Sequence, residues 1–199
     1  MKLFIAVLVL IFSLQSWTKA DDISDFEIEG ISIGDSLLDY MSVNEIKKWL
    51  KITKNHYKYL KEPLKFKEVY LMNDPNFETY TSLSFFIKSN DKNFKIFSLR
   101  GMKYYKNDMN SCLKVRNEIS KEIEKIINQY EKKERTVKSK LDKSGRSYHN
   151  NIVYDLNSGG KITISCNDWE ETLRKEKNWS EGLSVVLHSA ETKKWISNY

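Results

Sequence analysis

The chain has 199 residues, with 33 Lys and Arg, 27 Asp and Glu, and a formal net charge of +6. Only seven Gly and two Pro occur, which is typical of ordered elements and excludes a low-complexity chain. Without Lys2 and Lys19, both in the first twenty residues, the net charge falls to +4. This balance is too weak to indicate nucleic-acid binding. The 179 residues after that segment favour one domain with a hydrophobic core.

The first twenty residues have the pattern of a secretory signal peptide. Lys2 precedes an apolar run over residues 3–14, and the small residues Thr18 and Ala20 stand at the −3 and −1 positions of a cleavage site. The run is shorter than the ~20 residues that a membrane-spanning helix needs. We therefore expect residues 1–20 to be removed and residues 21–199 to form a single periplasmic or secreted domain without a transmembrane segment.

Charge is unevenly distributed over the expected domain. Residues 21–39 carry seven carboxylates and no Lys or Arg, whereas residues 47–67 carry eight Lys and one Glu, interleaved with aromatic residues. The two segments could lie side by side and neutralise each other. Alternatively, the basic segment could bind an anionic surface such as lipid headgroups or envelope polysaccharide. The residues of such a surface would be Lys47, Lys48, Lys51, Lys54 and Lys58.

The first half of the expected domain contains one helix and several strand patterns. Residues 26–33 alternate apolar with polar except at Gly30, which predicts an extended segment with one buried face. Ser42 and Glu45 have the spacing of a capping box, so a helix is predicted from Val43 to about Thr53. Strong turn signals then separate three aromatic and β-branched runs, which predict an antiparallel meander of strands at residues 66–72, 80–88 and 94–105.

The second half begins with the longest predicted helix. From Asp108 or Asn110 to Tyr130, apolar residues recur at spacings of three and four. Residues 131–146 are expected to prolong this helix or to form a flexible loop.

A hairpin is predicted next, around the Gly-rich turn at residues 157–160. Its strands are residues 152–156 and 161–166, followed by a short helix at 169–177, a strand at 183–188 and a helical turn at 191–196. The predicted fold is α+β: an antiparallel sheet of a three-stranded meander, a hairpin and a C-terminal strand, packed on one side by two main helices.

The two cysteines lie on apolar faces of two predicted elements. Cys112 belongs to the apolar stripe of the long helix, and Cys166 shares a strand face with Ile162 and Ile164. Both thiols should therefore enter the layer between helix and sheet. In an oxidising compartment such a pair forms a disulfide. A redox-active pair is not indicated, because the Cys-x-x-Cys spacing is absent.

One short motif points to catalysis. The string Ile33-Gly34-Asp35-Ser36-Leu37 resembles the nucleophile block of the GDSL (SGNH) hydrolases, which implies Ser36 as the nucleophile of an exported esterase. The family's Gly-x-Asn-Asp and Asp-x-x-His blocks are missing from this sequence. We therefore interpret Asp35 or Ser36 as the cap of a short helical turn through Met41, and the hydrolase as the alternative function.

A broader resemblance covers most of the expected domain. The segment FEIEGISIGDSLLDYMS, the Cys-bearing helix, the Ile164-Ser165-Cys166 strand and Trp195-Ile196 look like uncharacterised exported proteins of AT-rich bacteria. This resemblance implies export but no activity. The spacing of His, Cys and acidic residues indicates no metal site, and no cofactor is expected. The sequence thus favours a non-enzymatic binding or scaffold domain of the bacterial envelope, with an envelope protein or an anionic surface as partner.

Overall fold

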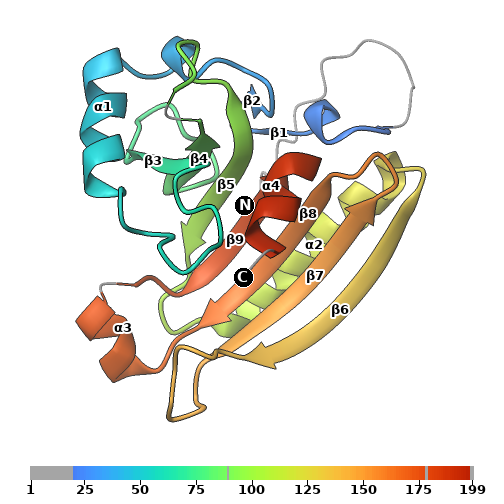
Figure 1. Cartoon of the computed structure of the whole chain (residues 1–199). Helices are drawn as coiled ribbons and strands as arrows, with labels where there is room; N and C mark the ends of the chain where they lie inside the picture. Colours follow the sequence, from blue (N-terminus) through green and yellow to red (C-terminus); the bar gives the residue numbers. More distant parts are fainter. Residues whose placement is uncertain (1–19, 89, 178, 198–199) are drawn as a thin grey trace.

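The computed structural model describes residues 20–88, 90–177 and 179–197 (Figure 1). Within these residues, seven strands form one antiparallel sheet in the order β3-β4-β5-β9-β8-β7-β6, and β1 and β2 form a separate hairpin. The strands are β1 (Glu27–Ile28), β2 (Ile31–Ser32), β3 (Lys67–Met72), β4 (Ser82–Ile87), β5 (Ile96–Tyr104), β6 (Tyr130–Lys138), β7 (Tyr148–Leu156), β8 (Lys161–Asp168) and β9 (Gly182–His188). The α-helices are α1 (Val43–Ile52), α2 (Met109–Ile126), α3 (Glu171–Lys177) and α4 (Ala190–Ser197).

The predicted α+β class is confirmed, together with most of the predicted elements. The capping box at the start of α1 is present: the Ser42 amide donates to Glu45 Oε2 over 2.9 Å, and the Glu45 amide donates to Ser42 Oγ over 3.3 Å. The Asp108 carboxylate accepts the Ser111 amide and caps α2. The meander, the hairpin and the C-terminal strand are all present, but they belong to one continuous sheet.

The prediction of helix or loop for residues 131–146 is wrong for its first half, residues 131–138, whereas residues 139–146 form a loop. Residues 130–138 form β6, which pairs with β7 alone and is the edge of the sheet. Most of its charged side chains are exposed. Local composition favours helix here, but pairing with β7 over nine residues outweighs that preference. The charged side chains also discourage another chain from adding to this edge.

Residues 26–33 form a hairpin instead of one extended segment. Glu29 and Gly30 both have positive φ, 54° and 74°, which is the backbone of a two-residue hairpin turn. The Glu29 carboxylate accepts three backbone amides of the loop after β3, from Glu78, Thr79 and Tyr80, over 2.8–2.9 Å. Through Glu29, the FEIEGISIGDSLLDYMS segment therefore attaches the N-terminal region to the loop between β3 and β4.

Helices lie on both faces of the sheet, so the prediction of packing on one side is wrong. In Figure 1, α2 runs behind β8 and β9, whereas α4 crosses in front of β5 and β9. The helix α1 packs along the edge strand β3. The helix α4 is too short for its sequence to reveal a buried face. Trp195 nevertheless inserts into a small second core with Leu60, Phe66 and Phe86.

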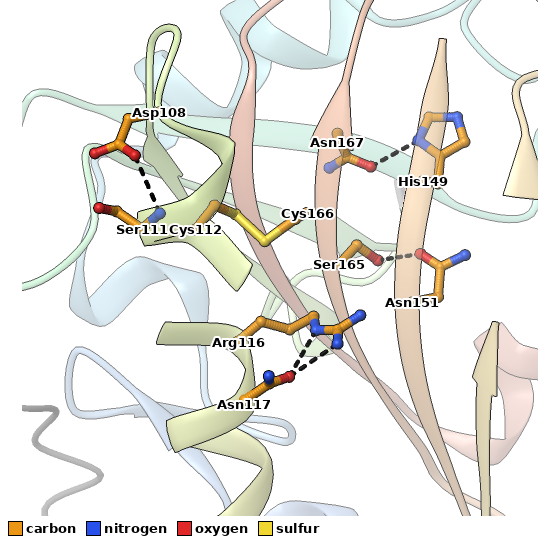
Figure 2. The surroundings of a disulfide bond; sticks show 10 residues. All are labelled: Asp108, Ser111, Cys112, Arg116, Asn117, His149, Asn151, Ser165, Cys166 and Asn167. Atoms are coloured by element: carbon orange, nitrogen blue, oxygen red, sulfur yellow. Dashed lines mark hydrogen bonds between the residues drawn. A yellow bond between two sulfur atoms is a disulfide. The ribbon is translucent and has the colours of Figure 1, made fainter. Parts of the chain in front are cut away.

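The face of the sheet that contacts α2 is the main hydrophobic core. There the predicted disulfide between Cys112 of α2 and Cys166 of β8 is confirmed, with a Cα–Cα distance of 6.0 Å (Figure 2). Ile162 and Ile164 of β8 and Ile119 and Ile123 of α2 belong to the same buried cluster.

The predicted signal peptide, residues 1–20, lies outside the described residues except for Ala20. The Ala20 amide donates to the Ile126 carbonyl over 2.8 Å. In the part of the chain that the structure describes, no helix is long and apolar enough to cross a bilayer.

Candidate functional site

A hollow of about 630 Å³ lies on the face of the sheet opposite α2. Its floor is made of alternate residues of neighbouring strands, because successive side chains of a strand point to opposite faces. On β8 and β9 the apolar residues at 162, 164, 166, 183, 185 and 187 face the core. The floor therefore receives Thr163, Ser165, Asn167 and Ser184. These side chains are too small to fill the space above the sheet.

Two aromatic pairs form walls of the hollow. Trp49 of α1 contacts Tyr70 of β3, with ring centroids 5.0 Å apart. Trp169 and Trp179, which flank α3, have ring centroids 4.4 Å apart. All four residues line the hollow and are half-buried, so they present flat apolar surfaces beside a polar floor.

Histidine and asparagine side chains brace the wall near α3. His149 Nδ1 lies 2.8 Å from Asn167 Oδ1, and Ser165 donates to Asn151 Oδ1 over 2.7 Å (Figure 2). The His149 ring packs edge-on against Trp169 at 4.7 Å between centroids. These contacts hold Trp169 and the floor residues in defined positions.

Arg100 of β5 is the main cation of the floor. Its Nε atom is buried, and no described residue accepts a hydrogen bond from it. Ser82 Oγ, also on the floor, is buried without a partner in the described residues. Buried polar groups are seldom left unsatisfied, so each such group calls for an explanation.

Glu68 of β3 is a buried carboxylate beside the hollow. Its Oε2 atom accepts the Tyr57 hydroxyl over 2.8 Å and lies 3.4 Å from His56 Nδ1. Burial raises the pKa of Glu68, but the hydrogen bond from His56 and the charge of Arg100 outweigh burial and lower this pKa overall. The same hydrogen bond raises the pKa of His56, whose side chain is 42% exposed. At neutral pH Glu68 is therefore ionised.

The contact between His56 and Glu68 should make stability depend on pH. His56 has a raised folded-state pKa, so its contribution is complete below the unfolded pKa of about 6.5 and is lost as pH rises through the folded value. Glu68 has a lowered pKa, so its contribution is complete above about 4.3 and is lost as pH falls through its folded value. We expect the stability difference between wild type and His56→Gln to be greatest between these values and to shrink towards pH 8.

Urea unfolding at several pH values measures this difference. Glu68→Gln serves as the matched variant, because it removes the carboxylate while His56 stays. In that background the extra stability that His56 provides below about pH 6.5 should disappear, because only Glu68 raises the pKa of His56. A stability difference that grows above pH 7 would contradict the assignment.

His188 of β9 also lines the hollow but adds no charge to it. Burial lowers the pKa of His188 to about 3, with further lowering by the charges of Lys161 and Arg100. Its Nδ1 lies 2.8 Å from Ser98 Oγ, and the Ser98 hydroxyl donates to the Leu187 carbonyl. The imidazole is therefore neutral at physiological pH.

Ser36 lies away from these residues. Its hydroxyl donates to the Asn93 carbonyl over 2.7 Å and accepts the Leu38 amide over 3.2 Å, so it caps the short 3-10 helix Leu37–Asp39 as predicted. It shares a surface depression with Gly34, Asp91, Asn93 and Lys95. The histidines are paired elsewhere: His56 with Glu68, His149 with Asn167, and His188 with Ser98. No described histidine forms a hydrogen bond with Ser36 or lines its depression, and a serine needs an adjacent base to act as a nucleophile.

The five lysines of the predicted anionic-surface site, Lys47, Lys48, Lys51, Lys54 and Lys58, are all exposed on α1 and the loop that follows it. None of the ion pairs among the described residues includes them. The acidic segment at residues 21–39 therefore does not neutralise them through direct ion pairs. Ile52 and Leu64 are also exposed in this region, by 52% and 70%.

The hollow was not predicted from the sequence, although a signal for it exists. On β8, small polar residues alternate with apolar ones, as in Thr163-Ile164-Ser165-Cys166-Asn167, and β9 begins in the same way with Leu183-Ser184-Val185 before Val186 interrupts the alternation. The same alternation holds over Ser82-Leu83-Ser84 of β4. Such strands bury one face and leave the other polar and thinly filled. Only the order of strands shows that these polar faces are contiguous.

Comparison of the chain with family models, curated proteins and solved structures found no match. Among the described residues, no group of three or more His, Cys, Asp and Glu side chains could hold a metal ion.

Proposed function

We propose that residues 21–199 form a non-enzymatic, exported binding domain of the bacterial envelope, which takes a small ligand into the hollow. The observation that supports this function is the hollow itself: about 630 Å³, within the range of small-molecule sites, with aromatic walls and a polar floor. Export is supported by the signal-peptide pattern of residues 1–20 and by the Cys112–Cys166 disulfide, which suits an oxidising compartment.

The titratable groups beside the hollow favour binding over catalysis. Ser98 and His188 have the separation of a nucleophile and its base. However, a histidine whose pKa is about 3 is a poor base at neutral pH, and the Ser98 hydroxyl already donates to a backbone carbonyl. Glu68 is engaged by Tyr57 and His56.

A binding screen tests the proposal. Small sugars, aromatic acids and aromatic amides would be added to the purified domain, and the indole N–H signals of its tryptophans followed by NMR. At least one class should shift the signals of Trp49, Trp169 or Trp179. Ser184→Phe should abolish the shift, because Ser184 is on the floor and is 8% exposed. Thr136→Phe, on the exposed strand β6, should leave it unchanged.

The hydrolase alternative is separated in the same preparation. A chromogenic acetate ester is expected to be hydrolysed at the same rate by wild type and by Ser36→Ala. Turnover that disappears in Ser36→Ala would replace the binding function by the hydrolase.

A second candidate function is reversible binding to anionic lipid through the lysines of α1 and its loop. It is favoured by the five exposed lysines outside any ion pair of the described residues, with Ile52 and Leu64 exposed among them. Each lysine near an anionic membrane surface contributes about 1 kcal/mol. Lys47→Gln, Lys48→Gln and Lys51→Gln together should therefore weaken binding to vesicles that contain phosphatidylserine or cardiolipin by about tenfold or more.

Vesicle sedimentation at two salt concentrations measures this effect. The control combines Lys138→Gln, Lys140→Gln and Lys143→Gln, which removes equal charge from another exposed region. Binding should weaken with salt and require anionic lipid. Equal loss in both triple variants would indicate a net-charge effect and contradict a defined surface.

A further inference from the structure

Arg100 of β5 lines the hollow. On β4 it is opposite Ser84, and on β9 it is opposite Val186. The neighbouring floor residues Ser82 and Ser184 are also small. A guanidinium group is thus surrounded by short side chains, with open space above it.

No carboxylate of the described residues forms an ion pair with Arg100. Glu181, which also lines the hollow, lies 3.6 Å from Arg174 Nε. Glu68 uses one oxygen for Tyr57 and His56, and its other oxygen has no hydrogen-bond partner in the described residues. Arg100 therefore feels the field of Glu68 without a direct hydrogen bond to it, and its Nε is left buried and unsatisfied.

An arginine without an ion-pair partner is suited to binding an anionic ligand. Arg100 lines the hollow without a carboxylate partner among the described residues, so an anionic ligand there would supply the charge-assisted hydrogen bonds that the guanidinium lacks. The planar guanidinium matches carboxylate and phosphate groups, which can accept two parallel hydrogen bonds from it. His188 is neutral and supplies no positive charge to an anion, whereas Lys103 is a second cation that lines the hollow.

The walls indicate the shape of the rest of the ligand. The pairs Trp49–Tyr70 and Trp169–Trp179 both line the hollow and present half-buried ring faces. Flat or ring-shaped groups pack well on such faces.

We propose that the hollow binds a small organic anion, with its carboxylate or phosphate on the Arg100 guanidinium and a ring-shaped body against the tryptophan walls. This inference rests on the proposed function, since it names the class of ligand that the same hollow takes.

The test compares three probes of one shape: benzoate, phenyl phosphate and neutral benzamide. Binding to the full domain is measured by NMR shifts of the tryptophan indole signals. Loss of a charge-assisted hydrogen bond costs about 1.5–3 kcal/mol, so benzamide should bind at least tenfold more weakly than the better anion. The ratio of benzoate to phenyl phosphate affinity shows which anionic group the site prefers.

Two substitutions locate the anion. Arg100→Gln should weaken the better anion at least tenfold and leave benzamide unchanged, whereas Arg100→Lys should restore part of the affinity. Arg135→Gln is the matched control, because Arg135 is an exposed arginine of the edge strand β6 and does not line the hollow. Circular dichroism of each variant confirms folding before the titration.

The outcomes separate the two proposals. Equal affinities for benzamide and benzoate would overturn the anion inference and leave the binding function standing. Undiminished anion binding by Arg100→Gln, or equal weakening by Arg135→Gln, would also overturn it. If none of the three probes shifts the tryptophan indole signals at millimolar concentration, the anion inference is contradicted. If no compound of the small-molecule screen shifts them either, the binding function is overturned as well.

Discussion

Replacing Cys112 and Cys166 together with Ser is expected to lower the free energy of unfolding by about 2–5 kcal/mol. The bond joins residues 54 apart, for which the loss of chain entropy in the unfolded state corresponds to roughly 4 kcal/mol. Both cysteines are fully buried, so the introduced hydroxyls would also lie in an apolar layer. Urea unfolding of the oxidised wild type and the double variant measures the difference.

Two controls identify the origin of the loss. Reduced wild type should fall close to the double variant, and Cys112→Ala with Cys166→Ala should retain slightly more stability than the Ser pair. Thiol counting on denatured, unreduced protein should find no free thiol. Two free thiols per chain, or no change in stability on reduction, would show that the bond is absent.

Trp195→Ala is expected to destabilise the protein by about 3–5 kcal/mol. Trp195 is 1% exposed and packs on Tyr57, Phe66 and Phe86, with ring centroids 5.2–5.5 Å away. Its indole N–H donates to the Glu62 carbonyl over 2.7 Å. This side chain joins α4 to the loop between α1 and β3, so its truncation leaves a cavity where these elements meet.

Variants at neighbouring positions separate packing from hydrogen bonding. Trp195→Phe keeps an aromatic ring but loses the N–H donor, so it should cost less than Trp195→Ala. Lys194→Ala, on the exposed side of α4, should change stability by no more than about 0.5 kcal/mol. A loss below 1 kcal/mol for Trp195→Ala, measured by urea unfolding, would mean that α4 does not stabilise the sheet.

Local patterns predicted much of the fold. The Ser42–Glu45 capping box and the apolar stripe of α2 depend on residues three and four positions apart. Such residues are neighbours on a helix, so the sequence alone predicts both features. The disulfide could be predicted because each cysteine lies on the buried face of its own element. Both faces are buried in the same core, so the sulfurs could be expected to meet even though the strand order was unknown.

Features that depend on distant pairing were missed. The segment at residues 130–138 is charged and locally helix-prone, and only the presence of β7 beside it makes it a strand. Glu29 reads as one polar residue in an alternating run, yet its carboxylate holds the backbone of residues 78–80. Neither the strand at residues 130–138 nor the contacts of Glu29 can be predicted from the residues that are near them in the sequence.

The amino-acid sequence by itself determined the fold class, the main elements, the disulfide and the exposed lysines of α1. The tertiary structure alone decided the candidate site. Arg100, Ser184 and Trp169 become neighbours of one hollow only because strand order places β4, β5, β9 and β8 side by side. Periodicity shows which face of a strand is polar, but the shape of a cavity depends on which polar faces adjoin, and that is set by long-range pairing of the whole sheet.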